Sequence, residues 1–406
     1  ATGMAPIAMY DGSGGRIAFE SNGTVVTGAM NLKGRYPWGA TDGQAEGTLA
    51  ILGNTSGSGD FSYNSGTLVI DTTAGYWHHS SGKHGTGVIT SHEDNGTNYK
   101  ICTFTFDTID LQGVLTVELK GENSLILKTQ NHGDVTIGVN LNADGGDQTY
   151  NNTRTPGNHH NFGFGKLGGR MGGWPGSSGA AAGRGPGGGT LRVLNNQKGG
   201  GGGYGSPGEY ADIGSGGGTY GSPALTHLHG GSSGGAGSGM GSGAGGGAMS
   251  IQADGNGTLT ILSGVTISAN GGKTNYPNHG QNGGGGSGGS LRFVGKSIVN
   301  NGTISAKGGT GAKLPSGGGG RVSFSYNYNL TQGTVDVGSG NYVGTINEST
   351  KPIIVGNLAV TGTYSSLQYA LPVTRFGDLT LWYKFDEASG TTAVDSSGGG
   401  NDGTLV

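Results

Sequence analysis

Two pairs of acidic residues have the spacing that acid–base cleavage of a polysaccharide would require. Asp107 and Asp110 flank Thr108-Ile109, and Asp144 and Asp147 flank a Gly-Gly turn. Enzymes that hydrolyse glycosidic bonds use such paired carboxylates as acid and base. Acidic residues are otherwise sparse, and both pairs equally suit turns or solvated strand faces. We therefore predict no enzymatic activity, and polysaccharide cleavage stays as an alternative.

Histidines gather at three places in the sequence. They are His78-His79 with His84, His159-His160, and His227-Leu228-His229. A His-x-His sequence on a strand directs both rings to one face, which suits a metal ion. No cysteine or acid stands at ligand spacing beside these residues, so we expect solvent-facing rings that form hydrogen bonds rather than a zinc site.

Near the C-terminus, Asp386, Asp395 and Asp402 form a candidate series of oxygen ligands for Ca²⁺. We predict no other metal and no cofactor. The single cysteine, Cys102, lies in sequence typical of a strand, so we expect a buried, unreactive thiol. With one cysteine, no internal disulfide is available to stabilise the fold.

The composition indicates how such side chains would be positioned. Of the 406 residues, 95 are glycine, 32% are hydrophobic and 12% are charged. A disordered chain is usually richer in charge, whereas a solenoid buries only a thin core in each turn. The net charge of -3 and the lack of a basic run argue against a nucleic-acid partner. No apolar run is long enough to span a membrane.

Three short motifs recur and predict β-structure throughout. The first is Gly-Thr followed by alternating apolar residues, as at Gly66-Thr67 and Gly257-Thr258. Such sequences begin a strand after a tight turn. The second closes a strand, and the third restarts one after a glycine tract. The second occurs at 143–146, 269–272 and 306–309; the third occurs at 246–251, 288–293 and 319–324.

These motifs predict an all-β chain with a parallel β-solenoid-like body, glycine-rich insertions and a terminal strand that is donated to a neighbour. An antiparallel sandwich is the second candidate. We expect an N-terminal β region over 1–98, solenoid rungs over 99–160, a glycine-rich repeat region over 161–326, a β connector over 327–377 and an incomplete segment or donor strand over 378–406.

The glycine tracts have three interpretations at this stage. They are flexible loops, or ordered loops pinned by aromatic residues such as Trp174, Tyr204, Tyr210 and Tyr220, or packed polyglycine II helices. Polyglycine II has about three residues per turn and no internal hydrogen bonds, so its backbone groups bond to neighbouring chains. The entropy lost on ordering glycine opposes that arrangement.

Two resemblances follow from these residues. The sequence GGGGSGGSLRFVGKSIVNNGTISAKGGTGAKLPSGGGGRVSFSY over 283–326 resembles the glycine-rich β-helix repeat regions of very large bacterial surface proteins, and the likeness extends over about 135–326. The segment LWYKFDEASG over 381–390, with the acidic turns after it, is similar to the start of laminin-G-like, concanavalin-type jelly rolls. That second resemblance implies binding of glycans or proteins, sometimes with Ca²⁺.

A jelly roll needs far more chain than the segment 378–406 supplies. A strand that cannot complete its own sheet exposes unpaired backbone groups, and pairing with a neighbouring molecule satisfies them. Repeated head to tail, this contact builds a filament. The residues that we expect to make it are Leu381, Tyr383, Phe385, Thr404 and Val406.

We therefore expect an extracellular, cell-surface structural protein that forms or decorates a filament by strand exchange and makes adhesive contacts. The expected partners are other copies of the chain, surface glycans or receptor proteins, without nucleic acid and without membrane insertion. The main alternative is a phage tail-fibre tip or surface adhesin, in which glycine-free insertions at 223–229 and 273–277 contact a receptor.

Overall fold

The fold was analysed on a computed structural model. It describes residues 16–21, 48–53, 59–148, 163–173, 182–191, 198–211, 215–237, 241–274, 283–310, 315–339, 342–350, 392–394 and 403–404. The chain divides into two compact units, Ala1–Lys351 and Pro352–Val406. Every regular element in these ranges is a β-strand, which confirms the predicted all-β class. No helix long and apolar enough to cross a membrane occurs within them.

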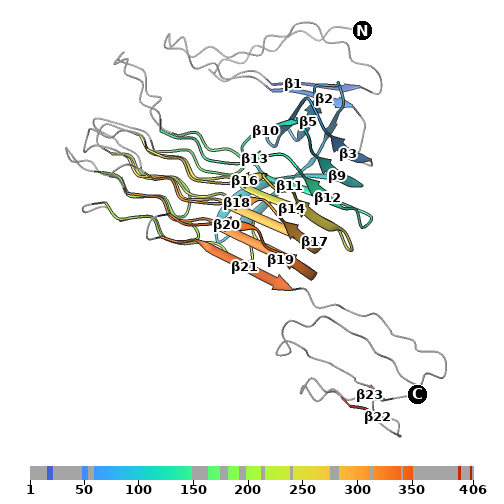
Figure 1. Cartoon of the computed structure of the whole chain (residues 1–406). Coiled ribbons are helices and arrows are strands. Elements are labelled where there is room, and N and C mark those ends of the chain that lie inside the picture. The colour runs from blue at the N-terminus through green and yellow to red at the C-terminus, as the bar shows by residue number, and fades with distance from the viewer. Residues whose placement is uncertain are drawn as a thin grey trace, which may run out of the picture. The chain divides into compact units, whose positions relative to one another are not determined.

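The first unit contains 21 of the strands labelled in Figure 1, and the second contains a two-stranded antiparallel pair. The strands of the first unit are β1 (Arg16–Ser21), β2 (Thr48–Gly53), β3 (Asp60–Tyr63), β4 (Thr67–Asp71), β5 (Tyr76–His79), β6 (His84–Thr86), β7 (Val88–Asp94), β8 (Thr97–Phe106), β9 (Thr108–Leu111), β10 (Thr116–Lys120), β11 (Ser124–Thr129), β12 (Val135–Ile137), β13 (Leu141–Asn142), β14 (Ala248–Gln252), β15 (Thr258–Ile261), β16 (Thr266–Ser268), β17 (Ser290–Asn300), β18 (Thr303–Ser305), β19 (Arg321–Thr331), β20 (Thr334–Asp336) and β21 (Thr345–Thr350). Those of the second unit are β22 (Thr392–Ala393) and β23 (Gly403–Thr404).

The longest parallel stack runs β8-β11-β14-β17-β19-β21 (Figure 1). Its register keeps apolar residues in one row: Cys102, Leu125, Met249, Leu291, Val322 and Ile346. The first five of these are buried, and Ile346 on the last strand is exposed. Because strand side chains alternate between faces, one row of apolar residues fixes which face of the whole stack is buried.

Two further parallel stacks have the same organisation. One runs β3-β9-β12-β15 and continues through the second half of β17, and the other runs β13-β16-β18-β20. Consecutive strands of the chain belong to different stacks, so β11, β12 and β13 contribute one strand to each. The second candidate from sequence, an antiparallel sandwich, is wrong for these strands because their pairing is parallel. The antiparallel pairs of this unit are confined to β4-β5-β6 and β7-β8 among the described strands.

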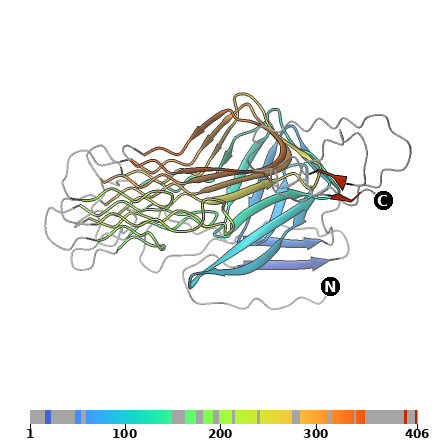
Figure 2. The ribbon, with the colours of Figure 1, turned by 90° about the horizontal axis from the view of Figure 1, so that it is seen from below.

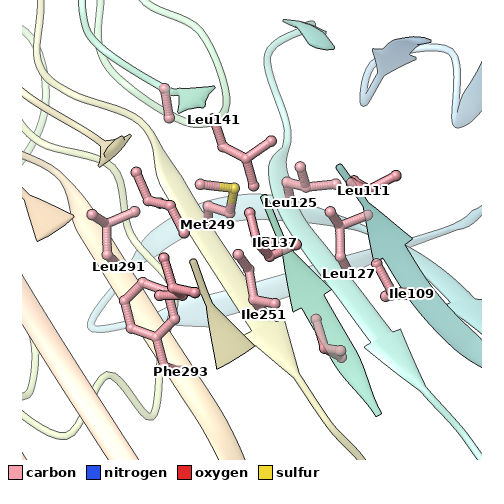
Figure 3. Close-up of a cluster of buried hydrophobic side chains, with 14 of the residues drawn as sticks. Ile109, Leu111, Leu125, Leu127, Ile137, Leu141, Met249, Ile251, Leu291 and Phe293 are labelled. Atoms are coloured by element: carbon pink, nitrogen blue, oxygen red, sulfur yellow. The ribbon is translucent and has the colours of Figure 1, made fainter. Parts of the chain in front are cut away.

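The core lies between the stacks. Figure 3 shows Leu125, Leu127, Met249, Ile251 and Phe293 converging from adjacent strands, and each is at most 1% exposed. They belong to one cluster of buried apolar residues that extends from Phe61 to Val337. A chain with few apolar residues can build this core because each strand places at most three side chains in it.

The glycine-rich segments extend from the strand stacks as a layered array of chains (Figures 1 and 2). Segment 283–289 shows how they are joined, because its backbone N–H groups donate to three neighbouring segments in strict rotation. Gly284 and Ser287 donate to Gly235 and Ser232, Gly285 and Gly288 donate to Pro315 and Gly318, and Gly286 and Gly289 donate to Gly272 and Ala269. A period of three residues therefore governs these bonds.

The same segment accepts hydrogen bonds from three other directions. Its carbonyl groups accept from the N–H groups of Gly202, Gly243, Gly246 and Gly309. Segment 283–289 is thus bonded to six surrounding stretches of chain. A side chain would prevent this packing, since a Cβ at Gly286 would overlap the carbonyl oxygen of Ala244. Glycine is required here for close approach of backbones, not for flexibility.

Copies of each of the two strand-linking motifs stack on one another. Ala248, Ser290 and Arg321, which follow glycine pairs, lie in one row of the first stack. The backbone N–H groups of Ala143, Ala269 and Ala306 donate in turn to the carbonyl groups of Ser268, Ser305 and Asp336.

The Gly-Thr motif is less regular. It begins β4, β15, β18 and β20, but Gly189-Thr190 lies in the glycine array and forms no strand, because its N–H groups bond to Ser233 and Ser215.

Candidate functional site

The β7–β8 hairpin projects the first residues of a polar site. Its turn, Asn95-Gly96, has φ values of 48° and 77°, the positive pair that a two-residue hairpin turn requires. Asp94 stands before this turn and pairs with Thr97, while His92 pairs with Tyr99 on the facing strand. The sequence Asp-Asn-Gly-Thr therefore fixes the positions from which Asp94 and Tyr99 reach the glycine-rich region.

The segment 220–230 supplies the facing side chains. Leu225 has a φ of 51° in a tight turn, and it is 1% exposed. Leu228 and His229 are also buried, and the Leu228 carbonyl accepts a hydrogen bond from the Ser124 hydroxyl. This insertion was expected, under the adhesin alternative, to be a receptor-contacting loop. In the structure Leu225 and Leu228 are buried, and Leu228 packs against Ile101 and Ala248 of the first strand stack, whereas Pro223 and Thr226 are exposed.

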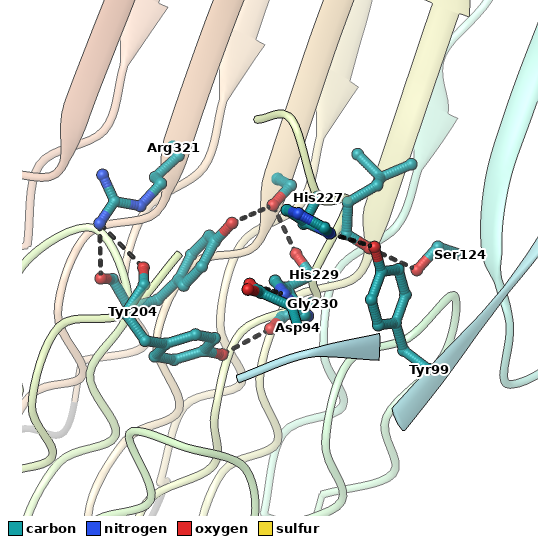
Figure 4. Close-up of polar contacts among 11 residues, drawn as sticks. Asp94, Tyr99, Ser124, Tyr204, His227, His229, Gly230 and Arg321 are labelled. Atoms are coloured by element: carbon teal, nitrogen blue, oxygen red, sulfur yellow. Dashed lines mark hydrogen bonds and ion pairs between the residues drawn. The ribbon is translucent and has the colours of Figure 1, made fainter. Parts of the chain in front are cut away.

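Two hydrogen bonds join the hairpin to this segment (Figure 4). The Tyr99 hydroxyl lies 2.9 Å from His227 Nδ1, and His229 Nε2 lies 2.7 Å from Asp94 Oδ2. The two imidazole rings stack with centroids 6.2 Å apart, so the His-x-His pattern does place both rings on one side. The expectation that both rings face solvent is wrong for His229, because the hairpin covers it.

The covered site changes the proton affinity of its members. Burial lowers the pKa of His229 below its ordinary value, and the hydrogen bond and charge of Asp94 oppose that effect. Burial, with a contribution from Asp94, raises the pKa of Tyr99. The His229 ring is therefore held as a neutral hydrogen-bonding group that Asp94 orients.

A second group of buried residues continues the site toward β19. The Tyr204 hydroxyl lies 2.6 Å from Ser290 Oγ, and burial raises the pKa of Tyr204 to about 12. The Tyr220 hydroxyl donates to the carbonyl of Gly230 at 2.6 Å. Arg321 donates to the carbonyl groups of Tyr204 and Tyr220 (Figure 4). These contacts fasten the glycine array to the strands, and they confirm part of the expectation that aromatic residues pin it. Tyr210, in contrast, is 67% exposed, and Trp174 lies outside the described residues.

A groove of ≈ 380 Å³ opens beside this site. Its walls come from β8, from the turn before β11 and from the glycine segments 165–171 and 184–186. Lys100, Arg170 and Arg184 line it, together with Glu122 and the outer parts of Tyr99, Tyr220 and His229. The groove can accept a polar ligand of small-molecule size.

The acidic pairs predicted from sequence have structural partners. Asp144 Oδ1 accepts the backbone N–H of Asn270, and Asp147 Oδ1 accepts that of Lys273. Asp107 accepts the side-chain amide of Gln130, and Asp110 accepts that of Gln112. The carboxylates of Asp107, Asp144 and Asp147 therefore fix the positions of adjacent chain segments, whereas Asp110 bonds within its own segment. None of the four lines the groove.

Several predicted residues lie outside the described residues. They are the Ca²⁺ candidates Asp386, Asp395 and Asp402, the assembly residues Leu381, Tyr383, Phe385 and Val406, and His159-His160. Thr404 is described and pairs with Thr392 in the β22–β23 pair. Within the described ranges, no group of three His, Cys, Asp or Glu side chains is arranged for a metal ion. Cys102 is fully buried in β8, as predicted, and burial raises its pKa to about 12.

Comparison of the chain with protein-family models, with curated proteins and with solved structures finds no match. The site must therefore be interpreted from its own residues. Sequence reasoning missed Asp94, Arg170 and Arg184, because their partners are far away in the chain. The one available signal was the Asp-Asn-Gly-Thr turn, which predicts the hairpin but not what the hairpin covers.

Proposed function

We propose that this chain is an extracellular, cell-surface structural protein that forms or decorates a filament by β-strand pairing between copies, and that its surface makes adhesive contacts. The observation that carries this proposal is the outer edge of β21, which has no second neighbour among the described strands and lies at the end of a long parallel stack.

The body that we propose is a parallel β-solenoid joined to a bundle of polyglycine II helices. In support of the solenoid, consecutive strands enter three stacks in turn, and each return places the chain in register with the preceding turn. In support of polyglycine II, the donors of segment 283–289 address three neighbours with a period of three residues. A body of this kind is stiff and elongates by adding turns, which suits a structural role.

The edge of β21 offers a place for another strand. Thr345 donates its N–H to Gly320 on the β19 side. In a parallel strand the backbone groups of alternate residues point to opposite sides, so those of Ile346 and Glu348 point away from β19. Within the described residues, β21 has no second neighbour. An unpaired edge of this kind is a template for pairing with another chain.

The test uses two variants at one position of the full-length chain. Glu348→Pro removes the outward N–H and leaves the bonds of β21 to β19 in place, whereas Glu348→Thr changes the side chain alone. Negative-stain electron microscopy should show long fibres for the natural chain and for Glu348→Thr, and short particles for Glu348→Pro. Fibres that are unchanged by Glu348→Pro would overturn the role of this edge.

The source of the added strand is tested separately by deleting residues 378–406. If that segment donates the strand, the truncated chain stays folded and forms no fibres. Fibres formed without it would indicate pairing with another strand of the neighbouring copy. Discrete particles formed by the natural chain itself would favour the alternative of a receptor-binding adhesin.

A further inference from the structure

We propose that the groove beside the Tyr99–His227 contact binds a short saccharide that carries a carboxylate, such as a uronic acid unit. This inference specifies the adhesive part of the proposed function and rests on the body being exposed at a surface. It does not require the chain to polymerise.

The groove gathers positive charge from separate parts of the chain. Lys100 comes from β8, Arg170 from the segment 163–173 and Arg184 from the segment 182–191. Among the described residues, none of these three side chains takes part in an ion pair. Glu122 is the one carboxylate among the described residues that line the groove, and Asp94, which is not part of the lining, bonds to His229. The groove therefore has an excess of positive charge in a chain whose net charge is -3.

The backbone holds the two arginines in place while leaving their side chains for a ligand. Arg170 donates its N–H to Gly231 and accepts from Gly245, and the N–H of Arg184 bonds to Ser233 Oγ at 2.8 Å. Gly185 has a φ of 96°, and a Cβ there would lie 3.0 Å from Cγ of Arg170. Glycine at this position thus makes room for Arg170 beside Arg184. The backbones of two arginines are thus fixed beside the groove that both residues line, and a guanidinium group suits the planar, bidentate recognition of a carboxylate.

The rest of the lining fits a ligand rich in hydroxyl groups. Asn98 and Asn123 line the groove and carry amides, and Glu122 can accept hydrogen bonds from hydroxyl groups. A volume of ≈ 380 Å³ lies near the lower end of the range for small-ligand sites, about 300–1,000 Å³, which favours a short saccharide. Three cations in one short groove are too few to follow a nucleic-acid backbone, where affinity grows with each phosphate contacted.

The experiment is calorimetric titration of the full chain with a glucuronic acid disaccharide, with its neutral glucose counterpart and with inorganic phosphate. We expect the acidic disaccharide to bind at least about ten-fold more tightly than either of the other two ligands, because one charge-assisted hydrogen bond contributes a difference in affinity of about this size. Arg184→Gln should weaken that binding about ten-fold or more, and its backbone contact to Ser233 is unaffected by the change. Lys296→Gln, at an exposed site on β17 outside the groove, is the matched control and should bind as the natural chain does.

Equal binding of the neutral disaccharide would overturn the requirement for a carboxylate. Equal binding of phosphate would reduce the groove to a general anion site, and tighter binding of single-stranded DNA would assign it to a different ligand class. An unchanged affinity in Arg184→Gln would place the ligand elsewhere. Electron microscopy of the same samples separates the two proposals: binding without fibres contradicts the assembly proposal alone, and fibres without binding contradict this inference alone.

Discussion

The guanidinium carbon of Arg321 lies 5.2 Å from the centre of the Tyr204 ring. Arg321 begins β19, whereas Tyr204 belongs to the glycine-rich segment 198–211. Arg321 is 5% exposed and has no ion pair among the described residues, so the ring face, two backbone carbonyls and the Thr345 hydroxyl stabilise its charge. The contact therefore joins the glycine array to the strand stacks at a buried point.

Removing the Tyr204 ring should destabilise the whole first unit. Tyr204→Ala leaves a large cavity beside a buried cation, and we expect a loss of about 3–5 kcal/mol in the free energy of unfolding. Tyr210→Ala is the matched control, since Tyr210 is 67% exposed, and it should change stability by less than about 0.5 kcal/mol. Urea denaturation followed by tyrosine and tryptophan fluorescence measures both. Similar stabilities for the two variants would mean that the glycine array is not fastened at Tyr204.

Glycine positions in the array should tolerate alanine only where no backbone lies close. Gly286→Ala brings a Cβ into the carbonyl of Ala244, so we expect destabilisation by about 1–3 kcal/mol or more. Gly218→Ala is the comparison, because no atom lies within 4 Å of the added Cβ. It should be neutral or stabilise by up to about 1 kcal/mol through a less flexible unfolded chain. Thermal unfolding of the two variants, followed by circular dichroism, tests this difference. Equal melting temperatures would contradict the close packing around Gly286.

Two histidines should make stability fall in mild acid. Burial lowers the pKa of the covered His229, and partial desolvation followed by the charge of Lys120 lowers the pKa of His78, which is an exposed residue of β5. The unfolded chain then binds protons at a higher pH than the folded chain. The contribution of these histidines to the free energy of unfolding is therefore fully present above the ordinary histidine pKa of about 6.5, and it decreases as the pH falls below that value.

Replacing these histidines should flatten that dependence. His229→Gln should lose less stability between pH 7 and pH 5 than the natural chain, and the double variant with His78→Gln should lose least. Denaturation midpoints measured across this range provide the test. A double variant with the slope of the natural chain would show that other groups control the acid sensitivity.

The strands were predictable because their signals are local. Alternating apolar residues around Leu125 and Val135, and the glycine pairs before Ser290 and Arg321, specify strand positions. Whether the glycine tracts are ordered or flexible was not predictable in the same way. A glycine run such as 283–286 has the same local sequence in a flexible linker and in a packed array, and the difference lies in six neighbours contributed by distant segments.

The candidate site was less predictable still. The sequence indicated His227 and His229 but not their partners, since Tyr99 and Asp94 are separated from them by 128 and 135 positions. The spacing of Asp144 and Asp147 suggested an acid–base pair, whereas each carboxylate accepts a backbone N–H of the next turn of chain. Short-range spacing describes turns well and long-range sites poorly, because the strand stacks bring distant turns together.

Amide hydrogen exchange across residues 283–289 tests the central claim most directly. If the glycine array is a hydrogen-bonded part of the fold, the N–H groups of residues 284–289 exchange as slowly as those of β14 and β17, because each of the six bonds to a neighbouring segment. The Asn95-Gly96 turn of the hairpin serves as the internal reference for rapid exchange. Exchange over 283–289 as fast as in that turn would show that the tracts are flexible loops and would contradict the account.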